Sequence, residues 1–135
     1  MLKLIIGIKG TGKTKTLISM VNEAVDASKG DVVCVEKGTK LRFDVKYQAR
    51  LINVDDYYVD DAHSLFGFIA GIFASNHDVT ELFVDSALKI CNNNVEEFEE
   101  LVTKVSKLAE NAGTRILFTV SMPIEEASET LRQFI

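Results

Sequence analysis

Four runs of apolar residues along the chain show no alternation with polar residues. Such runs are typical of strands that are covered on both faces, as in a parallel sheet. They are short and most contain β-branched residues, which favours strands over buried helices. The pattern therefore predicts four central strands, at residues 2–6, 32–35, 82–84 and 115–120.

Between these runs, apolar residues recur at helical spacing. This spacing predicts one helix over residues 14–27 and another over residues 61–75. A third helix is expected to begin after Asn94, because Asn94 suits the N-cap position and Glu97 follows three residues later. The amphipathic stripe of this third helix is formed by Phe98, Leu101, Val102, Val105 and Leu108.

The ends of the helices are indicated by glycine and proline. Gly30 and Gly113 stand where the first and third helices are expected to end. A last helix is expected to open at residues 121–123. Strands and helices therefore alternate along residues 1–135, which predicts one α/β domain with a mostly parallel sheet and helices on both faces, a three-layer α/β/α arrangement.

The segment 40–47 has a different pattern, because apolar and charged residues alternate strictly. This alternation predicts a half-exposed strand, and residues 51–54 are expected to pair with it as a hairpin. The residues on its apolar face are Leu41, Phe43, Val45 and Tyr47.

Composition narrows the class of protein. The chain is 47% hydrophobic and 26% charged, which argues against disorder and against a fibrous repeat. A net charge of −5 works against non-specific binding to nucleic acid, so nucleic acid is not predicted as a partner. Cys34 and Cys91 have neither metal-type spacing nor a close pairing, and the apolar run 65–74 is too short to span a membrane. We expect a cytoplasmic protein without a membrane span.

The stretch GIKGTGKTK directly follows the first predicted strand. Gly7, Gly12, Lys13 and Thr14 fill the spacing G-x-x-x-x-G-K-[ST]. Glycines at these positions let backbone N–H groups surround phosphate oxygens, and the N-terminus of the following helix adds positive partial charge. The alternative is a glycine-rich turn without a ligand. The predicted nucleotide-binding residues are Gly7, Ile8, Lys9, Gly10, Thr11, Gly12, Lys13, Thr14 and Lys15.

This stretch resembles the Walker A motif of P-loop NTPases, and the chain is similar to small stand-alone bacterial P-loop proteins. The resemblance implies that ATP and Mg²⁺ bind, with Lys13 on the phosphates and Thr14 on the metal. It also implies a Walker B aspartate at the end of a buried strand. Asp85, which ends ELFVD, matches this position and would hold Mg²⁺ through water. The alternative is an acidic residue that only terminates the strand.

Hydrolysis needs a group that activates water, and two positions bear on it. Ser86 stands where many ATPases carry a glutamate after the Walker B aspartate. Glu36 ends the second predicted strand, which resembles the position of the catalytic glutamate in the RecA-like branch. The resemblance thus suggests Lys13, Glu36 and Asp85 as the catalytic set. Alternatively, Glu36 pairs with Lys37 or Lys40 at a solvated strand end.

Ser121 or Thr119 is the candidate sensor of the γ-phosphate, since their strand is expected to end beside it. Ser121 is equally well explained as the N-cap of the last helix. The basic segment 37–50 either contacts a phosphate-bearing partner or forms a lysine-protected sheet edge. The acidic stretch 55–63 favours helix capping over metal binding. The helix at 61–75 is unusually apolar, which suggests a contact with a second copy or a protein partner.

Three functions remain open from the sequence. The first is an ATP·Mg-binding protein that hydrolyses ATP slowly or acts as a nucleotide-dependent switch. The second is a small-molecule or nucleoside kinase, for which segment 37–50 is the only lid candidate. The third is an assembly module in which ATP orders loops without chemistry.

Overall fold

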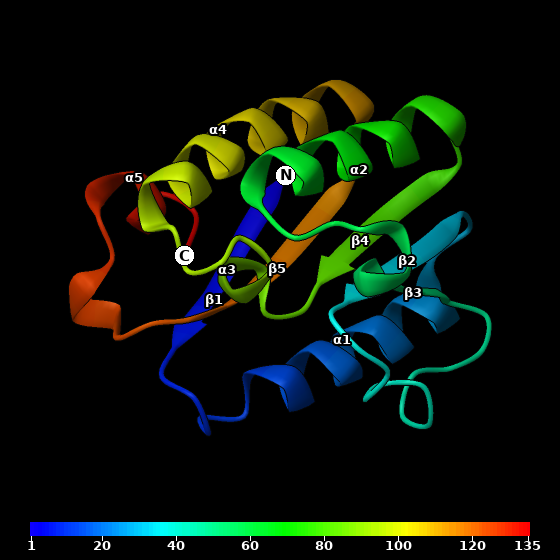
Figure 1. The fold of residues 1–135 in the computed structure, drawn as a ribbon. Coiled ribbons are helices and arrows are strands. Elements are labelled where there is room, and N and C mark those ends of the chain that lie inside the picture. The colour runs from blue at the N-terminus through cyan, green and yellow to red at the C-terminus, as the bar shows by residue number, and fades with distance from the viewer.

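The computed structural model describes all residues, 1–135, and contains one five-stranded sheet (Figure 1). Every neighbouring pair of strands is parallel, and the strand order is β1-β5-β4-β2-β3. The strands are β1 (Leu2–Gly7), β2 (Asp31–Glu36), β3 (Arg50–Asn53), β4 (Val79–Val84) and β5 (Arg115–Ser121). The four strands expected from the apolar runs are therefore confirmed as β1, β2, β4 and β5, and the α/β fold class with them.

Helices cover both faces of this sheet, as Figure 1 shows. One face is covered by α1 (Lys13–Ala27), and the other by α2 (Ala62–Ser75) and α4 (Val95–Ala112), which pack against each other. The smaller elements are α3 (Ala87–Ile90), α5 (Glu129–Arg132) and the 3-10 turns η1 (Val54–Tyr57) and η2 (Ile124–Glu126). The sheet thus separates two hydrophobic clusters, a larger one under α2 and α4 and a smaller one under α1.

Two predicted N-caps are confirmed. The Asn94 side chain accepts a hydrogen bond from the backbone N–H of Glu97 at 3.0 Å, and Gly113 ends α4 in the left-handed conformation. Asp61 caps α2 in the same way through Ser64, at 2.7 Å. The hydrogen bonds that the backbone N–H and the hydroxyl of Ser64 donate to Asp61 hold the pKa of this carboxyl below its usual range. The capping role expected for the acidic stretch is therefore found at Asp61.

The predicted strand at 40–47 is wrong, and so is its hairpin pairing with 51–54, although residues 51–53 do belong to a strand, β3. Residues 37–49 form a series of turns that connects β2 to β3, and β3 runs parallel to β2. A parallel pair cannot be joined by a hairpin, so the segment has to cross over the sheet. Burial recurs at every fourth residue, because Leu41, Val45 and Ala49 enter the smaller cluster beside α1.

The C-terminal prediction also needs correction. Ser121 does not cap a helix, since it is the last residue of β5, and the final helix begins only after Ser128, whose side chain accepts from Leu131 N–H at 3.3 Å. Pro123 opens the turn η2 instead.

Gly30 does not end α1, contrary to the prediction from the sequence. The C-cap is Ser28, and Gly30 lies where an added Cβ would be 2.4 Å from the carbonyl oxygen of Asp78.

The apolar helix α2 finds most of its partners within the chain. Phe66, Phe68, Ile72 and Phe73 are partly buried against the larger cluster. Gly67 and Gly71 have no other atom of the chain within 4 Å of an added Cβ, so the contact that we expect between α2 and a second copy or a protein partner stays a prediction. No helix has both the length and the apolarity that crossing a bilayer requires.

Candidate nucleotide site

The parallel topology gathers the candidate residues at one edge of the sheet. In a parallel sheet all carboxyl ends lie on the same side, which is where ligands bind in α/β folds. Gly7 at the end of β1 is in register with Ser121 at the end of β5. Val84, the last residue of β4, is in register with Val35, next to Glu36 at the end of β2. The residues at this edge come from positions 7 to 121 of the chain.

The loop between β1 and α1 has the backbone that its glycines predict. Gly10 and Gly12 have φ of 88° and 85°, a left-handed conformation that other residues rarely adopt. Gly12 precedes α1, and no side chain caps the helix N-terminus. The first N–H groups of α1 are therefore free of a side-chain cap at the sheet edge, where they suit an anion.

Lys13 bends back over this loop. Its Nζ donates a hydrogen bond to the carbonyl oxygen of Ile8 at 2.8 Å and lies 3.5 Å from the hydroxyl of Thr11. Thr11 in turn donates to the same carbonyl at 2.8 Å. The ammonium group of Lys13 is thus held against the loop that surrounds the expected phosphate position.

Thr14 and Asp85 are hydrogen-bonded at the carboxyl edge of the sheet, although 71 residues separate them in the chain. The Thr14 hydroxyl lies 3.1 and 3.2 Å from the two carboxylate oxygens of Asp85. The buried hydroxyl of Thr119 donates to Asp85 Oδ1 at 2.7 Å and accepts from the N–H of Ser86 at 2.7 Å. Thr119 is therefore a positioning residue for Asp85, a role that the sequence did not predict for it.

The oxygen donors at this point fit Mg²⁺. Hydroxyl and carboxylate oxygens are hard ligands, and Mg²⁺ keeps several waters and takes phosphate oxygens instead of a full protein cage. The chain offers no group of three or more His, Cys, Asp or Glu side chains that would hold a metal by themselves. A hydroxyl and one carboxylate beside the uncapped N-terminus of α1 are donors of the kind that a metal–phosphate complex takes.

Glu36 does not lie at a solvated strand end, as the second alternative from the sequence would place it. Its side chain is 4% exposed, and its carboxylate accepts the backbone N–H of Lys40 at 3.0 Å and of Leu41 at 3.3 Å. No ion pair with Lys37 or Lys40 forms, since Lys37 pairs with Asp55 at 2.6 Å. Burial raises the pKa of Glu36, and the nearby Asp85 raises it further, while the two backbone hydrogen bonds oppose the shift.

A cavity of about 660 Å³ joins these groups. This is within the range of small-ligand sites, roughly 300–1,000 Å³. Only one of its 16 lining residues is hydrophobic, which suits a polar ligand. The lining residues are Lys9, Gly10, Gly12, Lys13, Thr14, Lys15, Glu36, Lys37, Lys40, Leu41, Asp85, Ser86, Lys89, Asn93, Thr119 and Ser121.

The cavity both extends and narrows the predicted site. It adds Lys89 and Asn93, which lie in and after the short helix α3. Their only signal in the sequence was their position shortly after Asp85. Three of the predicted nucleotide-binding residues, Gly7, Ile8 and Thr11, do not line the cavity. Arg42 and Arg50 do not line it either, so neither arginine serves the site within this chain.

The two cysteines take no part in the site. Both are buried, and burial raises the pKa of the Cys91 thiol to about 12 and that of Cys34 further.

No protein-family model matches the chain, and no curated protein is significantly similar to it in sequence.

Proposed function

We propose that the chain is a P-loop NTPase that binds ATP with Mg²⁺ at the carboxyl edge of its sheet. The observation that carries the proposal is the contact of Thr14 with Asp85, at 3.1 and 3.2 Å, beside the glycine loop that Lys13 closes. In this proposal the loop N–H groups and Lys13 bind the β- and γ-phosphates. Thr14 would ligate the metal directly, and Asp85 would hold one of its water ligands.

The same residues support hydrolysis by a water molecule. Bound Mg²⁺ would neutralise charge on the phosphate oxygens. Glu36 is the only carboxylate in the cavity besides Asp85, and burial raises its pKa, which makes its ionised form a better proton acceptor than an ordinary glutamate. Its role is to orient the attacking water and accept a proton from it. Ser121, at the tip of β5, is the polar group that contacts the γ-phosphate.

Turnover is expected to be slow. Glu36 already accepts two backbone N–H groups, which stabilise its ionised form and weaken it as a base. Asp85 is followed by Ser86, which cannot act as a base in its place. No arginine lines the cavity to stabilise charge in the transition state.

Glu36→Gln tests the hydrolysis step. The glutamine oxygen can still accept from the N–H of Lys40, so the fold and the binding of ATP should persist. Phosphate release should fall at least about 100-fold, the lower end of the range for losing a general base. Phosphate release and the Kd for ATP are measured on both proteins. Unchanged hydrolysis in Glu36→Gln would show that Glu36 is not the base.

A phosphotransferase is the second candidate. Lys9, Lys40 and Lys89 line the cavity from three separate segments, and none forms an ion pair. Three unpaired cations could hold a phosphorylated acceptor next to ATP. Incubation with ATP and a set of nucleosides and phosphorylated metabolites decides between the two, because a kinase consumes ATP only when its acceptor is present.

A further inference from the structure

The connection between β2 and β3 holds two aromatic side chains almost entirely in solvent. Phe43 is 85% exposed and Tyr47 is 91% exposed. Keeping an apolar ring in water forgoes the free energy that its burial would provide. Two such rings four residues apart are the most exposed aromatic pair within one connection of this chain, and they lie outside the nucleotide cavity.

The outward position of these rings is fixed by the packing of the segment. Leu41, Val45 and Ala49 are buried in the smaller cluster on the face of α1. The Asn22 side chain on α1 donates to the carbonyl oxygen of Asp44 and accepts the N–H of Lys46, both at 2.9 Å. Phe43 and Tyr47 lie between the anchored positions, so the anchors hold them outward.

Cations accompany the rings. The guanidinium of Arg42 lies 4.8 Å from the centre of the Phe43 ring. Lys37 and Lys46 are paired with Asp55 and Asp26, whereas Arg42 and Arg50 form no ion pair.

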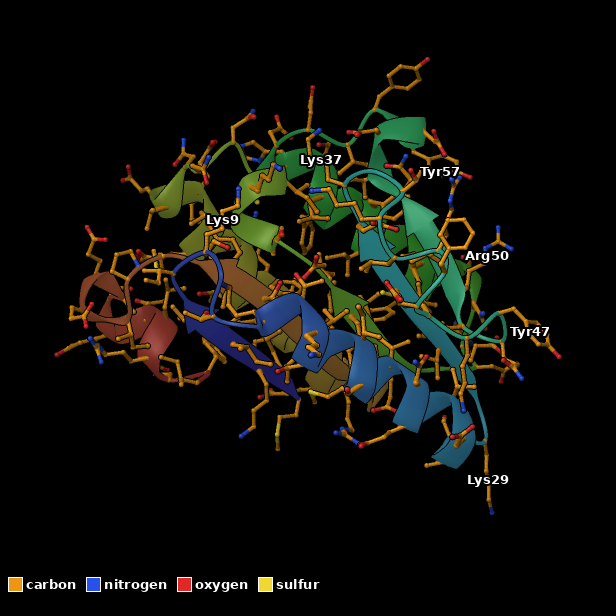
Figure 2. All side chains as sticks on the ribbon, turned by 90° about the horizontal axis from the view of Figure 1, so that it is seen from below. Lys9, Lys29, Lys37, Tyr47, Arg50 and Tyr57 are labelled. Carbon is orange, nitrogen blue, oxygen red and sulfur yellow. The ribbon has the colours of Figure 1, made fainter.

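A third ring lies beside the edge strand β3. Tyr57 is 57% exposed and its ring lies 5.9 Å from that of Phe68. Tyr47, Arg50 and Tyr57 project from the same side of the molecule (Figure 2). We give the name β3-edge patch to these three residues together with Arg42 and Phe43, which belong to the same connection as Tyr47.

We propose that the β3-edge patch binds single-stranded nucleic acid. Exposed aromatic rings provide faces on which unpaired bases stack, and the unpaired arginines contact the phosphates between them. The chain as a whole carries a net charge of −5, which disfavours long-range attraction to a polyanion and restricts the contact to this patch. An acidic protein would be attracted by the arginines but would not need several exposed ring faces.

Fluorescence anisotropy with two labelled strands of about 20 nucleotides tests the proposal, a length that exceeds the sites of single stacking surfaces. One strand is oligothymidylate, and the other has the same phosphates with tetrahydrofuran in place of every base. The purified chain is titrated at low salt without nucleotide, so the result does not depend on ATP binding. We expect the strand with bases to bind at least about tenfold more tightly, because stacking requires them.

Two double variants separate stacking from hydrophobic area. Phe43→Leu with Tyr47→Leu keeps apolar side chains but removes both ring faces, and should weaken binding at least about tenfold. Phe43→Tyr with Tyr47→Phe keeps both rings and should bind like the original chain. Arg42→Ala should reduce the slope of log K against log salt by about 0.7, the value for one phosphate contact on a single strand.

Three outcomes would overturn the proposal. One is that neither strand binds up to high micromolar protein. Another is that the strand without bases binds as tightly as oligothymidylate, which would reduce the interaction to charge alone. The last is that the leucine double variant binds like the original chain, which would leave the patch to an apolar or acidic protein partner.

Discussion

Asp85 is the residue on which the candidate site converges. Three hydrogen-bonding groups fix its position: the hydroxyls of Thr14 and Thr119 reach its carboxylate, and its own N–H donates to the carbonyl oxygen of Val35 at 2.9 Å. Ser86 follows with φ of 55°, an unusual conformation for a residue with a side chain. In this conformation the N–H of Ser86 donates a hydrogen bond to the hydroxyl of Thr119. A carboxylate fixed in this way suits the proposed role of Asp85, in which its oxygens have to face the metal-bound water.

Asp85→Asn tests that role. Asparagine keeps the shape and one oxygen acceptor but loses the negative charge that attracts a metal. The gain in ATP affinity that Mg²⁺ provides should shrink about 10–100-fold, as for other residues that orient a metal's ligands. The measurement is the Kd for ATP with Mg²⁺ and with EDTA in both proteins. An equal effect of Mg²⁺ on the two would contradict the metal role of Asp85.

Glu36 gives a prediction about pH. Its folded pKa is raised above the ordinary value of 4.5, so the folded chain binds this proton more tightly than the unfolded chain. Its contribution to stability is therefore largest at acid pH and falls as pH rises from about 4.5 through the raised value. Glu36→Gln removes this loss. The free energy of unfolding of both proteins is measured in urea between pH 4.5 and 7. We expect the stability of Glu36→Gln to rise with pH relative to that of the original chain. A difference in stability that stays constant over this range would contradict the prediction.

At the scale of elements, the connection after α1 depends on close packing at Gly30. A Cβ there would lie 2.3 Å from Thr80 Cγ2 and 2.4 Å from the carbonyl oxygen of Asp78, and the latter atom is backbone. The N–H of Asp31 also donates to this carbonyl at 2.8 Å, so the backbone cannot shift freely. Gly30 thus lets β2 begin directly against the turn before β4.

Gly30→Ala should lower the free energy of unfolding by about 1–3 kcal/mol, the usual cost of overpacking. Gly67→Ala is the control, because Gly67 lies inside α2 with nothing within 4 Å of an added Cβ. That change should stabilise the chain by up to about 1 kcal/mol through helix propensity. Urea unfolding of both variants and of the original chain checks this. If Gly30→Ala were as stable as the original chain, the contact at Gly30 would be relieved without cost.

The elements also show which patterns in the sequence were informative. Continuous apolar runs and helix caps depend on neighbouring residues, and they predicted β1, β2, β4, β5 and α4 closely. The alternation over 40–47 was misleading, because burial there follows the surface of α1 and not a strand. Leu41 and Val45 are buried whereas Phe43 and Tyr47 are exposed. Only the position of the segment between two parallel strands explains that difference.

At the scale of the molecule, strand order brings the site together. β5 lies between β1 and β4, so Ser121 and Thr119 are next to the glycine loop and to Asp85. The left-handed backbone of the glycine loop was predictable, because the spacing of its glycines is local and specific. The contact of Thr119 with Asp85, the cavity lysine Lys89 and the hydrogen bonds of Glu36 were not, because each depends on the tertiary packing of distant segments.

The measurement that tests the central claim most directly is the melting temperature of the chain with ATP and Mg²⁺. At 100 times the Kd, ligand binding stabilises the folded state by about 2.7 kcal/mol, or roughly 8–12 °C for a chain of this size. Lys13→Ala should lose this shift. Lys29→Ala should keep it, because Lys29 lies far from the loop that carries Lys9 (Figure 2). Equal melting temperatures with and without every triphosphate, or an unchanged shift in Lys13→Ala, would contradict the account.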